Sequence, residues 1–300
     1  MRAVVVHQSG GPDVLSVEDA DRPEPEHGEV LIRVRAASVN PVDWKQRRSL
    51  APEDLPKVLG RDVAGAVERS REDGFTEGEE VFGVAGSGGY AEFTSSPAGV
   101  LAKKPAEVSD EQAAAIPIAG ITAWQSLFDV GGLERGQTAL IAGAAGGVGH
   151  FAVQFAKHAG ARVIGVGSSR NRDFVLGLGA DEYIDYTEQD VADAASGVDV
   201  VLDAVGGETT QTVVPTVRQG GIVVTIASAP PEEAARERGA RAEVLMARPN
   251  TEQLTRIAEL VAAGDVRVEL AEVLPLAKVR RAHELSESGH TRGKIVLRVA

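Results

Sequence analysis

The sequence predicts an α/β chain in which a β-rich unit is joined to a unit built on a parallel sheet. Up to about residue 115, short apolar runs alternate with glycine-containing turns, which is typical of a barrel-like β unit. From about residue 109 to residue 246, apolar strands alternate with helical patterns, which indicates βαβ units. The length of 300 residues suits two domains better than one.

The β-rich unit is expected to contain four strands in the first part of the chain. They are expected at residues 3–6, 29–36, 63–67 and 80–84. The end of the chain is expected to form a helix over 250–263, capped by Asn250 and stopped by Gly264, then a helix over 276–286 and a strand over 294–299. We expect this tail to pack on the first part of the chain.

The second unit is expected to hold six parallel strands. They are expected at residues 138–142, 162–166, 182–185, 198–203, 221–226 and 242–246. Val200, Val201 and Leu202 form a continuous apolar run, which fits a strand buried on both faces of a sheet. Strands that alternate with helices in this way predict a parallel sheet.

Composition and charge exclude several classes of function. Lys and Arg total 31 against 44 for Asp and Glu, a net charge of −13, so binding to nucleic acid is not expected. The absence of cysteine excludes disulfides, thiolate nucleophiles and sulfur-ligated zinc, and it fits a reducing cytoplasm. No apolar run approaches the roughly 18 residues of a membrane helix, and the first residues do not resemble a signal peptide. We therefore expect a cytoplasmic protein that does not enter a membrane.

A glycine-rich loop follows the strand at 138–142 and precedes a helical pattern. Its residues, all expected to bind a cofactor, are Gly143, Ala144, Ala145, Gly146, Gly147, Val148 and Gly149. Glycines in this position permit a tight turn, a close approach of the backbone to a pyrophosphate, and close packing of helix on strand. The exposed N–H groups at the start of the helix would hold the anion. The alternative is a turn with a structural role only.

The end of the next strand indicates which dinucleotide is bound. A site for NAD usually places an acidic residue about 20 residues beyond the glycines, but this chain has Gly167, Ser168, Ser169 and Arg170 there. Hydroxyl and guanidinium groups favour a ribose 2′-phosphate, which an acidic residue would repel. The sequence therefore predicts NADPH as cofactor. Alternatively, the serines only cap the next helix while Arg170 and Arg172 lie in solvent.

Seven short segments together carry a resemblance to a known family. They are residues 38–43, 59–65, 88–92, 119–124, 144–149, 203–207 and 292–297. With these segments the chain resembles the zinc-independent medium-chain dehydrogenase/reductase family, in the quinone oxidoreductase branch that includes ζ-crystallin. The resemblance implies a GroES-like catalytic domain over 1–117 and 247–300 and a Rossmann NADP-binding domain with a six-stranded parallel sheet over 118–246.

The resemblance also indicates that no metal takes part in the reaction. Zinc alcohol dehydrogenases of the family carry a cysteine near Asn40 and a Gly-His-Glu stretch where this chain has Gly60, Arg61 and Asp62. The six histidines, at positions 7, 27, 150, 158, 283 and 290, show no ligand spacing. We therefore expect no metal site.

The resemblance implies further site residues, although no acid–base catalyst stands out. The residues expected to bind substrate are Asn40, Asp43, Trp44 and Tyr90. The residues expected to border the cofactor, besides those of the two loops above, are Asn40, Thr122, Tyr186, Ala204, Val205, Gly206, Ile226, Ala227, Ser228 and Lys294. Alternatives remain open for five of them: Asn40 and Asp43 as turn residues, Thr122 as a helix cap, Trp44 as a core residue, and Tyr90 as a residue that packs the barrel.

The expected reaction is hydride transfer from NADPH to a quinone or an α,β-unsaturated carbonyl compound. Conjugation delocalises the developing negative charge, so such an acceptor depends less on a Lewis acid than a simple ketone does. The alternatives are an enoyl reductase of a biosynthetic pathway, with an acyl-carrier or CoA partner, and an NADPH-binding redox sensor with little turnover. The family resemblance also implies a homodimer, formed through the strand near residues 243–246.

Overall fold

The computed structural model describes residues 1–299, which form two compact units. The β-rich unit contains residues 1–119, 249–264 and the chain from 270 onward, and the parallel-sheet unit contains residues 120–248 and 265–269. The sequence predicted boundaries between the units after residues 117 and 246, two residues before the observed boundaries after residues 119 and 248. It did not assign the short segment 265–269 to the second unit.

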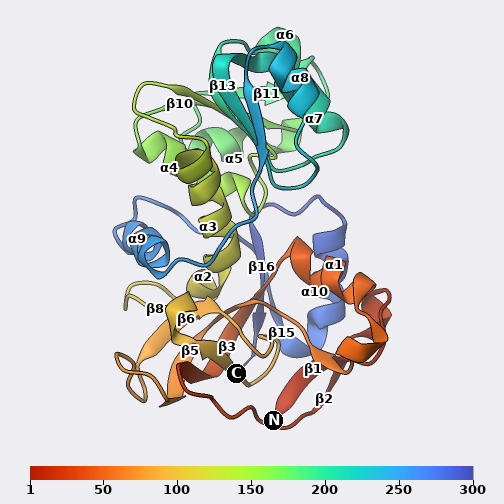
Figure 1. The fold of residues 1–300 in the computed structure, drawn as a ribbon, viewed down its shortest axis with the longest axis vertical. Helices are drawn as coiled ribbons and strands as arrows, with labels where there is room; N and C mark the ends of the chain where they lie inside the picture. Colours follow the sequence, from red (N-terminus) through yellow and green to blue (C-terminus); the bar gives the residue numbers. More distant parts are fainter. Residues whose placement is uncertain (300) are drawn as a thin grey trace. The chain divides into compact units, whose positions relative to one another are not determined.

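The β-rich unit is organised around one long strand, β3 (Glu29–Val39). This strand pairs antiparallel with β5, β7 and β16, and all three pairings are non-local. The largest sheet has the order β15-β16-β3-β5-β6-β8, and a smaller sheet has the order β2-β1-β4 (Figure 1). The other strands are β1 (Arg2–Val6), β2 (Ser16–Asp19), β4 (Lys57–Val58), β5 (Asp62–Ser70), β6 (Glu80–Val84), β7 (Phe93–Pro97), β8 (Leu101–Lys103), β15 (Leu270–Pro275) and β16 (Lys294–Arg298).

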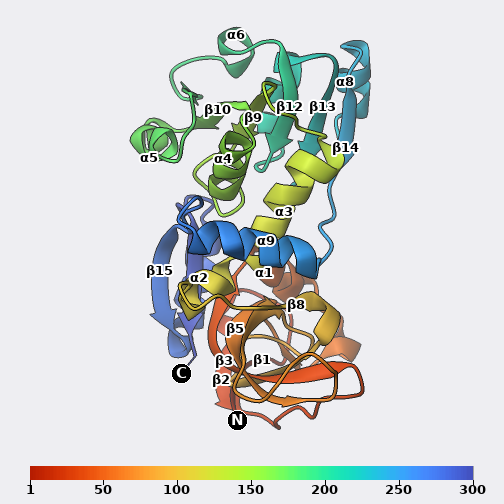
Figure 2. The ribbon, with the colours of Figure 1, turned by 90° about the vertical axis from the view of Figure 1, so that its left-hand side faces the viewer.

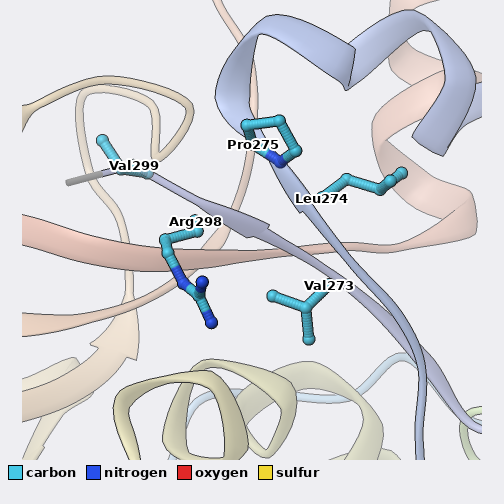
Figure 3. Close-up of a pocket in the computed structure, with 5 residues that line it drawn as sticks. All are labelled: Val273, Leu274, Pro275, Arg298 and Val299. Atoms are coloured by element: carbon cyan, nitrogen blue, oxygen red, sulfur yellow. The ribbon is translucent and has the colours of Figure 1, made fainter.

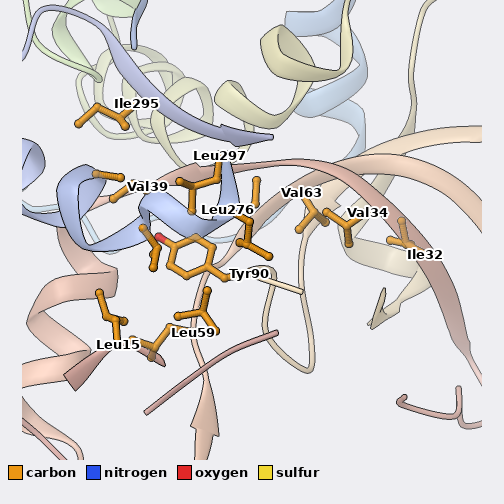
Figure 4. Close-up of a cluster of buried hydrophobic side chains, with 14 of the residues drawn as sticks. Leu15, Ile32, Val34, Val39, Leu59, Val63, Tyr90, Leu276, Ile295 and Leu297 are labelled. Atoms are coloured by element: carbon orange, nitrogen blue, oxygen red, sulfur yellow. The ribbon is translucent and has the colours of Figure 1, made fainter. Parts of the chain in front are cut away.

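The core of this unit gathers apolar side chains from distant parts of the sequence. Tyr90 lies among Leu15, Leu59, Leu276 and Leu297 in this core (Figure 4). Val30, Ile32 and Val34 of β3 contribute to this core, because alternate residues of a strand lie on the same face. The expected packing of the tail on the first part of the chain is confirmed by the pairing of β16 with β3.

Four helices lie within the β-rich unit, and the sequence patterns predicted two of them. They are α1 (Pro41–Ser49), α2 (Asp110–Ala115), α9 (Thr251–Ala262) and α10 (Val279–Glu287). The predicted cap of α9 is confirmed, since the Asn250 side chain accepts a hydrogen bond from the Gln253 N–H at 2.9 Å. Helix α1 was not predicted, because Asn40 before Pro41 reads as a turn. Proline is, however, well suited to the first position of a helix.

The parallel-sheet unit contains the predicted six-stranded sheet, and every strand pair in it is parallel. The strand order is β11-β10-β9-β12-β13-β14, and Figure 2 labels all of these strands except β11. The strands are β9 (Thr138–Ala142), β10 (Arg162–Gly167), β11 (Glu182–Asp185), β12 (Val198–Asp203), β13 (Val217–Thr225) and β14 (Arg241–Val244). The order reverses at β9, so the carboxyl ends of β9, β10 and β12 border the crevice where such sheets bind ligands.

Helices separate the strands of this sheet, as βαβ connections require. They are α4 (Gly149–His158), α5 (Arg172–Gly177), α6 (Val191–Ala194), α7 (Glu208–Val213) and α8 (Glu232–Glu237). A further helix, α3 (Pro117–Trp124), precedes β9 and continues into a π-helical segment, Gln125–Val130. None of the helices within residues 1–299 has both the length and the apolar character that a bilayer span requires.

Two glutamines explain why short segments of the chain belong to the parallel-sheet unit. The Gln154 side chain donates to the Arg267 carbonyl at 2.9 Å and accepts from the Arg267 N–H at 2.7 Å. Gln125 makes the same pair of bonds with Arg248, at 2.8 and 3.0 Å. Each carboxamide therefore replaces the partner strand that the backbone of these segments would otherwise need.

Candidate functional site

The glycine loop after β9 has the shape that a bound pyrophosphate requires. Gly143 adopts a φ of 73°, and a Cβ at Gly149 would lie 2.1 Å from the Gly143 carbonyl oxygen. Glycine at these positions therefore permits the turn and the close approach of α4 to β9. A Cβ at Gly146 would have the Gly143 oxygen as its only neighbour within 4 Å, so this side of the loop is open. The loop thus fits the diphosphate of a dinucleotide.

The turn after β10 presents polar and basic groups at the same end of the sheet. Ser169 and Arg170 are exposed, and no acidic residue stands at this turn. Ser168 occupies the capping position of the short 3-10 turn that follows, but its hydroxyl makes no capping hydrogen bond. The alternative in which the serines serve only as helix caps therefore has no support in the hydrogen bonds of this turn. Tyr186, just beyond β11, is 58% exposed.

The loop after β12 is held by Asp203, which the sequence analysis did not single out. One carboxylate oxygen of Asp203 accepts from the N–H groups of Val205 and Gly206, both at 2.9 Å. The other accepts from the Thr210 hydroxyl at 2.5 Å. Asp203 is fully buried, so these bonds hold the loop from its buried side. The Val205 side chain on the loop is 52% exposed. The signal in the sequence was the aspartate at a strand end, directly before a glycine-containing turn.

Ile226 and Ser228 lie beyond the end of β13, and Thr122 lies within α3. Ile226 follows β13, and its N–H donates to the Asp203 carbonyl at 3.1 Å. The Ser228 hydroxyl lies 3.3 Å from the Thr210 hydroxyl, which ties the loop after β13 to α7. Thr122 is the sixth residue of α3 and is 7% exposed, so its alternative role as a helix cap is wrong.

A buried cluster of polar groups surrounds Asn40 in the β-rich unit. The Asn40 amide group donates to Asp62 at 2.8 Å, and its carbonyl oxygen accepts from the Lys294 ammonium at 2.5 Å. Asp43 accepts from the Asn40 backbone N–H at 2.7 Å and from the Tyr90 hydroxyl at 2.8 Å. The side chains come from the ends of β3, β5 and β16 and from the first turn of α1. Local packing of strand ends therefore places two carboxyl groups and one ammonium group behind Asn40.

Burial sets the protonation of this cluster. Burial raises the pKa of Asp43 to about 6, although hydrogen bonds from Asn40 and Tyr90 oppose the shift. Burial also raises the pKa of Asp62 to about 7, against the opposing charge of Lys294. The pKa of Lys294 is lowered by its own burial. Each shift has the same cause, since a low-dielectric interior disfavours the charged form of any group.

The structure corrects the predicted substrate contacts of Asp43 and Tyr90. Both side chains are fully buried and bind each other, so they hold α1 against the barrel and present no surface to a substrate. The alternative that Tyr90 packs the barrel is thereby confirmed (Figure 4). Trp44 is half-buried, with the Arg48 guanidinium 5.1 Å from its ring, and its contact with substrate stays a prediction.

A second buried cation, Arg47, was missed by the sequence analysis. Its guanidinium is fully buried and donates to Gly10 O at 3.0 Å, to His283 Nδ1 at 2.8 Å and to Glu287 at 2.5 Å. These bonds join α1 to α10. Burial, and then the charge of Arg47, lower the pKa of His283 to about 3, so this histidine is a neutral acceptor. No local sequence pattern predicts the cluster, because Arg47 is 236 and 240 positions from its partners His283 and Glu287.

The described units hold no metal-binding cluster, and they hold a shallow pocket away from the predicted site residues. Within residues 1–299, no three His, Cys, Asp or Glu side chains come together as a metal-binding group. A shallow pocket of about 300 Å³ lies beside β15 and β16 (Figure 3). It is lined by Val273, Leu274, Pro275, Arg298 and Val299. Its lining is mainly apolar and carries none of the predicted site residues.

Comparisons with known proteins agree with both units. Residues 26–106 match the family model for the alcohol dehydrogenase GroES-like domain, and residues 178–297 match that for zinc-binding dehydrogenases. A chloroplast envelope quinone oxidoreductase homolog of Arabidopsis thaliana is 34% identical over 96% of this chain and 95% of its own length. An NADPH-dependent alkenal/one oxidoreductase from the same plant is 34% identical over 99% of this chain and 79% of its own.

Solved structures show the same architecture over the whole chain. The quinone oxidoreductase of Coxiella burnetii superposes with a TM-score of 0.94 at 35% identity, covering 100% of this chain and 99% of that one. A GroES-like unit joined to a Rossmann unit defines a medium-chain dehydrogenase/reductase. Within that class, the chain belongs to the zinc-independent quinone oxidoreductase branch.

The raised pKa of Asp62 predicts a pH-dependent contribution to stability. The folded state binds the proton more tightly than the unfolded state, so stability from this group is present at low pH and is lost as the pH rises through about 7. Asp62→Asn removes the titration. We expect the free energy of unfolding of the wild type, relative to that of D62N, to fall by about 2 kcal/mol between pH 5 and pH 8.

Chemical denaturation of both proteins at the two pH values measures this difference. Asp54→Asn, at an exposed position of the same unit, serves as the control and should show no such trend. A difference between wild type and D62N that is constant, or that rises with pH, would contradict the assignment of a buried, partly protonated Asp62.

Proposed function

We propose that the protein is an NADPH-dependent reductase that transfers hydride to a quinone or an α,β-unsaturated carbonyl compound without zinc. The observation that carries the proposal is the pairing of an open glycine loop after β9 with an acid-free, arginine-bearing turn after β10. The names of the relatives support it, since they include quinone oxidoreductases and an NADPH-dependent alkenal/one oxidoreductase.

The residues of the parallel-sheet unit fit the proposed cofactor. The backbone of the glycine loop offers N–H groups to the diphosphate, and Ser168, Ser169 and Arg170 offer hydroxyl and guanidinium donors to the 2′-phosphate. Thr122, the loop held by Asp203, and residues 226–228 would border the ribose and the nicotinamide. When bound, the reduced nicotinamide supplies the hydride, and these residues determine where it is delivered.

The residue types around Asn40 favour a conjugated acceptor over a simple ketone. Zinc enzymes of the family carry a cysteine near the position of Asn40, and this chain has none. Asn40 is instead fixed by Lys294 on its carbonyl side and by Asp62 on its amide side. Asn40 is 2% exposed, and the second N–H of its amide group would donate to an acceptor oxygen that reaches it, while water would supply the proton that completes the reduction. Because conjugation spreads the developing charge, such modest polarisation suffices.

Coenzyme preference tests the cofactor half of the proposal. We expect NADPH to bind at least about tenfold more tightly than NADH, because one charge-assisted contact to the 2′-phosphate contributes about 1.4 kcal/mol or more. Arg170→Ala and Ser168→Asp should each abolish this preference, the second by adding a negative charge beside the phosphate. Calorimetric titration with both coenzymes measures it. Equal affinities in the wild type would contradict the 2′-phosphate reading of the turn.

Acceptor turnover tests the reaction itself. We expect the protein to oxidise NADPH with 9,10-phenanthrenequinone or with an α,β-unsaturated ketone, and to reduce the matching saturated ketone at least about 100-fold more slowly, a difference of about 2.7 kcal/mol in the barrier. Incubation with EDTA should leave these rates unchanged. If NADPH binds but no conjugated acceptor is reduced, a redox sensor replaces the enzyme. If only acyl thioesters are reduced, an enoyl reductase replaces the quinone and enone reductase.

We also propose that the protein acts as a homodimer that pairs along β14. This strand is at the edge of the parallel sheet, and Val244 and Met246 are 46% and 79% exposed. An edge strand with exposed apolar side chains is a surface that a second copy of the chain can extend. Light scattering on the purified protein would show a monomer if the proposal is wrong. A cytoplasmic location, expected from the lack of cysteine, stays a prediction.

A further inference from the structure

The turn that would bind the 2′-phosphate rests on a tyrosine from the neighbouring strand. Tyr183 on β11 lies beside Gly165 in the register of β10 and β11, and it is only 6% exposed. Its hydroxyl donates to the carbonyl of Ser168 at 2.7 Å. The Asn171 N–H donates to the same carbonyl at 2.9 Å. The Ser168 carbonyl is thus directed to the buried phenol.

The glycine before this turn is explained by the same hydroxyl. Gly167 does not adopt a positive φ, so its backbone conformation is open to any residue. A Cβ at Gly167 would, however, lie 2.5 Å from the Tyr183 hydroxyl oxygen, and the next nearest atom, Cζ of the same ring, would be 3.4 Å away. The one serious clash is with the oxygen. Gly167 and the Tyr183 hydroxyl therefore form a matched pair.

This pair determines which groups the turn offers to a ligand. A carbonyl oxygen carries partial negative charge and would repel a phosphate if it faced one. With the Ser168 carbonyl held by Tyr183, the exposed side of the turn keeps the Ser169 hydroxyl and the Arg170 guanidinium. The guanidinium of Arg172 lies 5.9 Å from the Tyr183 ring centroid, which adds a further positive charge nearby.

From these contacts we infer that Tyr183 is a positioning residue for coenzyme selection. Its hydroxyl, accommodated by Gly167, holds the turn in the conformation that accepts a 2′-phosphate, and it acts through Ser168 without touching the coenzyme. The inference rests on the proposed NADPH binding at this turn. It adds a residue that lies outside the turn and that discriminates NADPH from NADH indirectly.

A double-mutant cycle with Tyr183→Phe and Gly167→Ala tests the inference. Calorimetry with NADPH and with NADH gives both dissociation constants for each protein. We expect Y183F to weaken NADPH binding about fivefold or more, which is about 1 kcal/mol, and to change NADH binding less than about twofold. G167A should have a similar effect because its methyl group displaces the hydroxyl. The two effects should be far from additive, since Y183F removes the atom with which the new methyl group clashes.

Tyr90→Phe is the matched control, because it removes another buried tyrosine hydroxyl, in the β-rich unit. It should lower stability and leave the ratio of the two coenzyme affinities unchanged. If Y183F weakens the binding of NADPH and NADH equally, Tyr183 has only a structural role and the inference is wrong. Unchanged affinities for both coenzymes, or additive effects of the two substitutions, would also overturn it. If G167A does not fold, Y183F alone still decides. A wild type without preference for NADPH would instead overturn the proposed function.

Discussion

The hydrogen bond between the buried Lys294 ammonium and Asn40 is the interaction on which the polar cluster of the β-rich unit depends. The antiparallel register that pairs Ile295 with Val39 brings the start of β16 beside the end of β3, and so places the two residues together. An ammonium group at 4% exposure requires partners. Asn40 binds it directly, and the charges of Asp62 and Asp43 favour its charged form. Because Asn40 also donates to Asp62 and binds Asp43 through its backbone N–H, its position is determined by the whole cluster.

The glycine loop of the parallel-sheet unit follows a different constraint, the close approach of backbone to backbone. Gly149 allows α4 to begin against β9, and Asp203 holds the loop after β12 by accepting from three donors. A few exposed side chains at the ends of the rigid strands then recognise the coenzyme. This division agrees with the general arrangement of doubly wound sheets, in which the scaffold positions loops and the loops bind the ligand.

Much of the fold could be predicted from sequence, because it depends on local patterns. The bounds of β9, β11 and β12 agree with the predicted ranges, since their apolar runs end at glycine or aspartate. What could not be predicted depends on distant contacts. The burial of Tyr90 and Asp43 requires the packing of α10 on α1, and the segment 265–269 joins the second unit through Gln154. From the sequence, Tyr183 was expected only as part of the strand at 182–185. Its hydrogen-bond partner is a backbone carbonyl, which no pattern of side chains reveals.

Delivery of hydride from NADPH to a conjugated acceptor without zinc is the step that gives the protein its proposed function. The most direct test uses NADPH deuterated at C4, in each of its two stereochemical forms, with an α,β-unsaturated ketone and EDTA-treated protein. We expect one form, and not the other, to transfer its deuterium to the β-carbon of the saturated product, while the hydrogen gained at the α-carbon comes from water. A saturated product that lacks deuterium at the β-carbon with both forms, or no product at all, would contradict hydride transfer from NADPH.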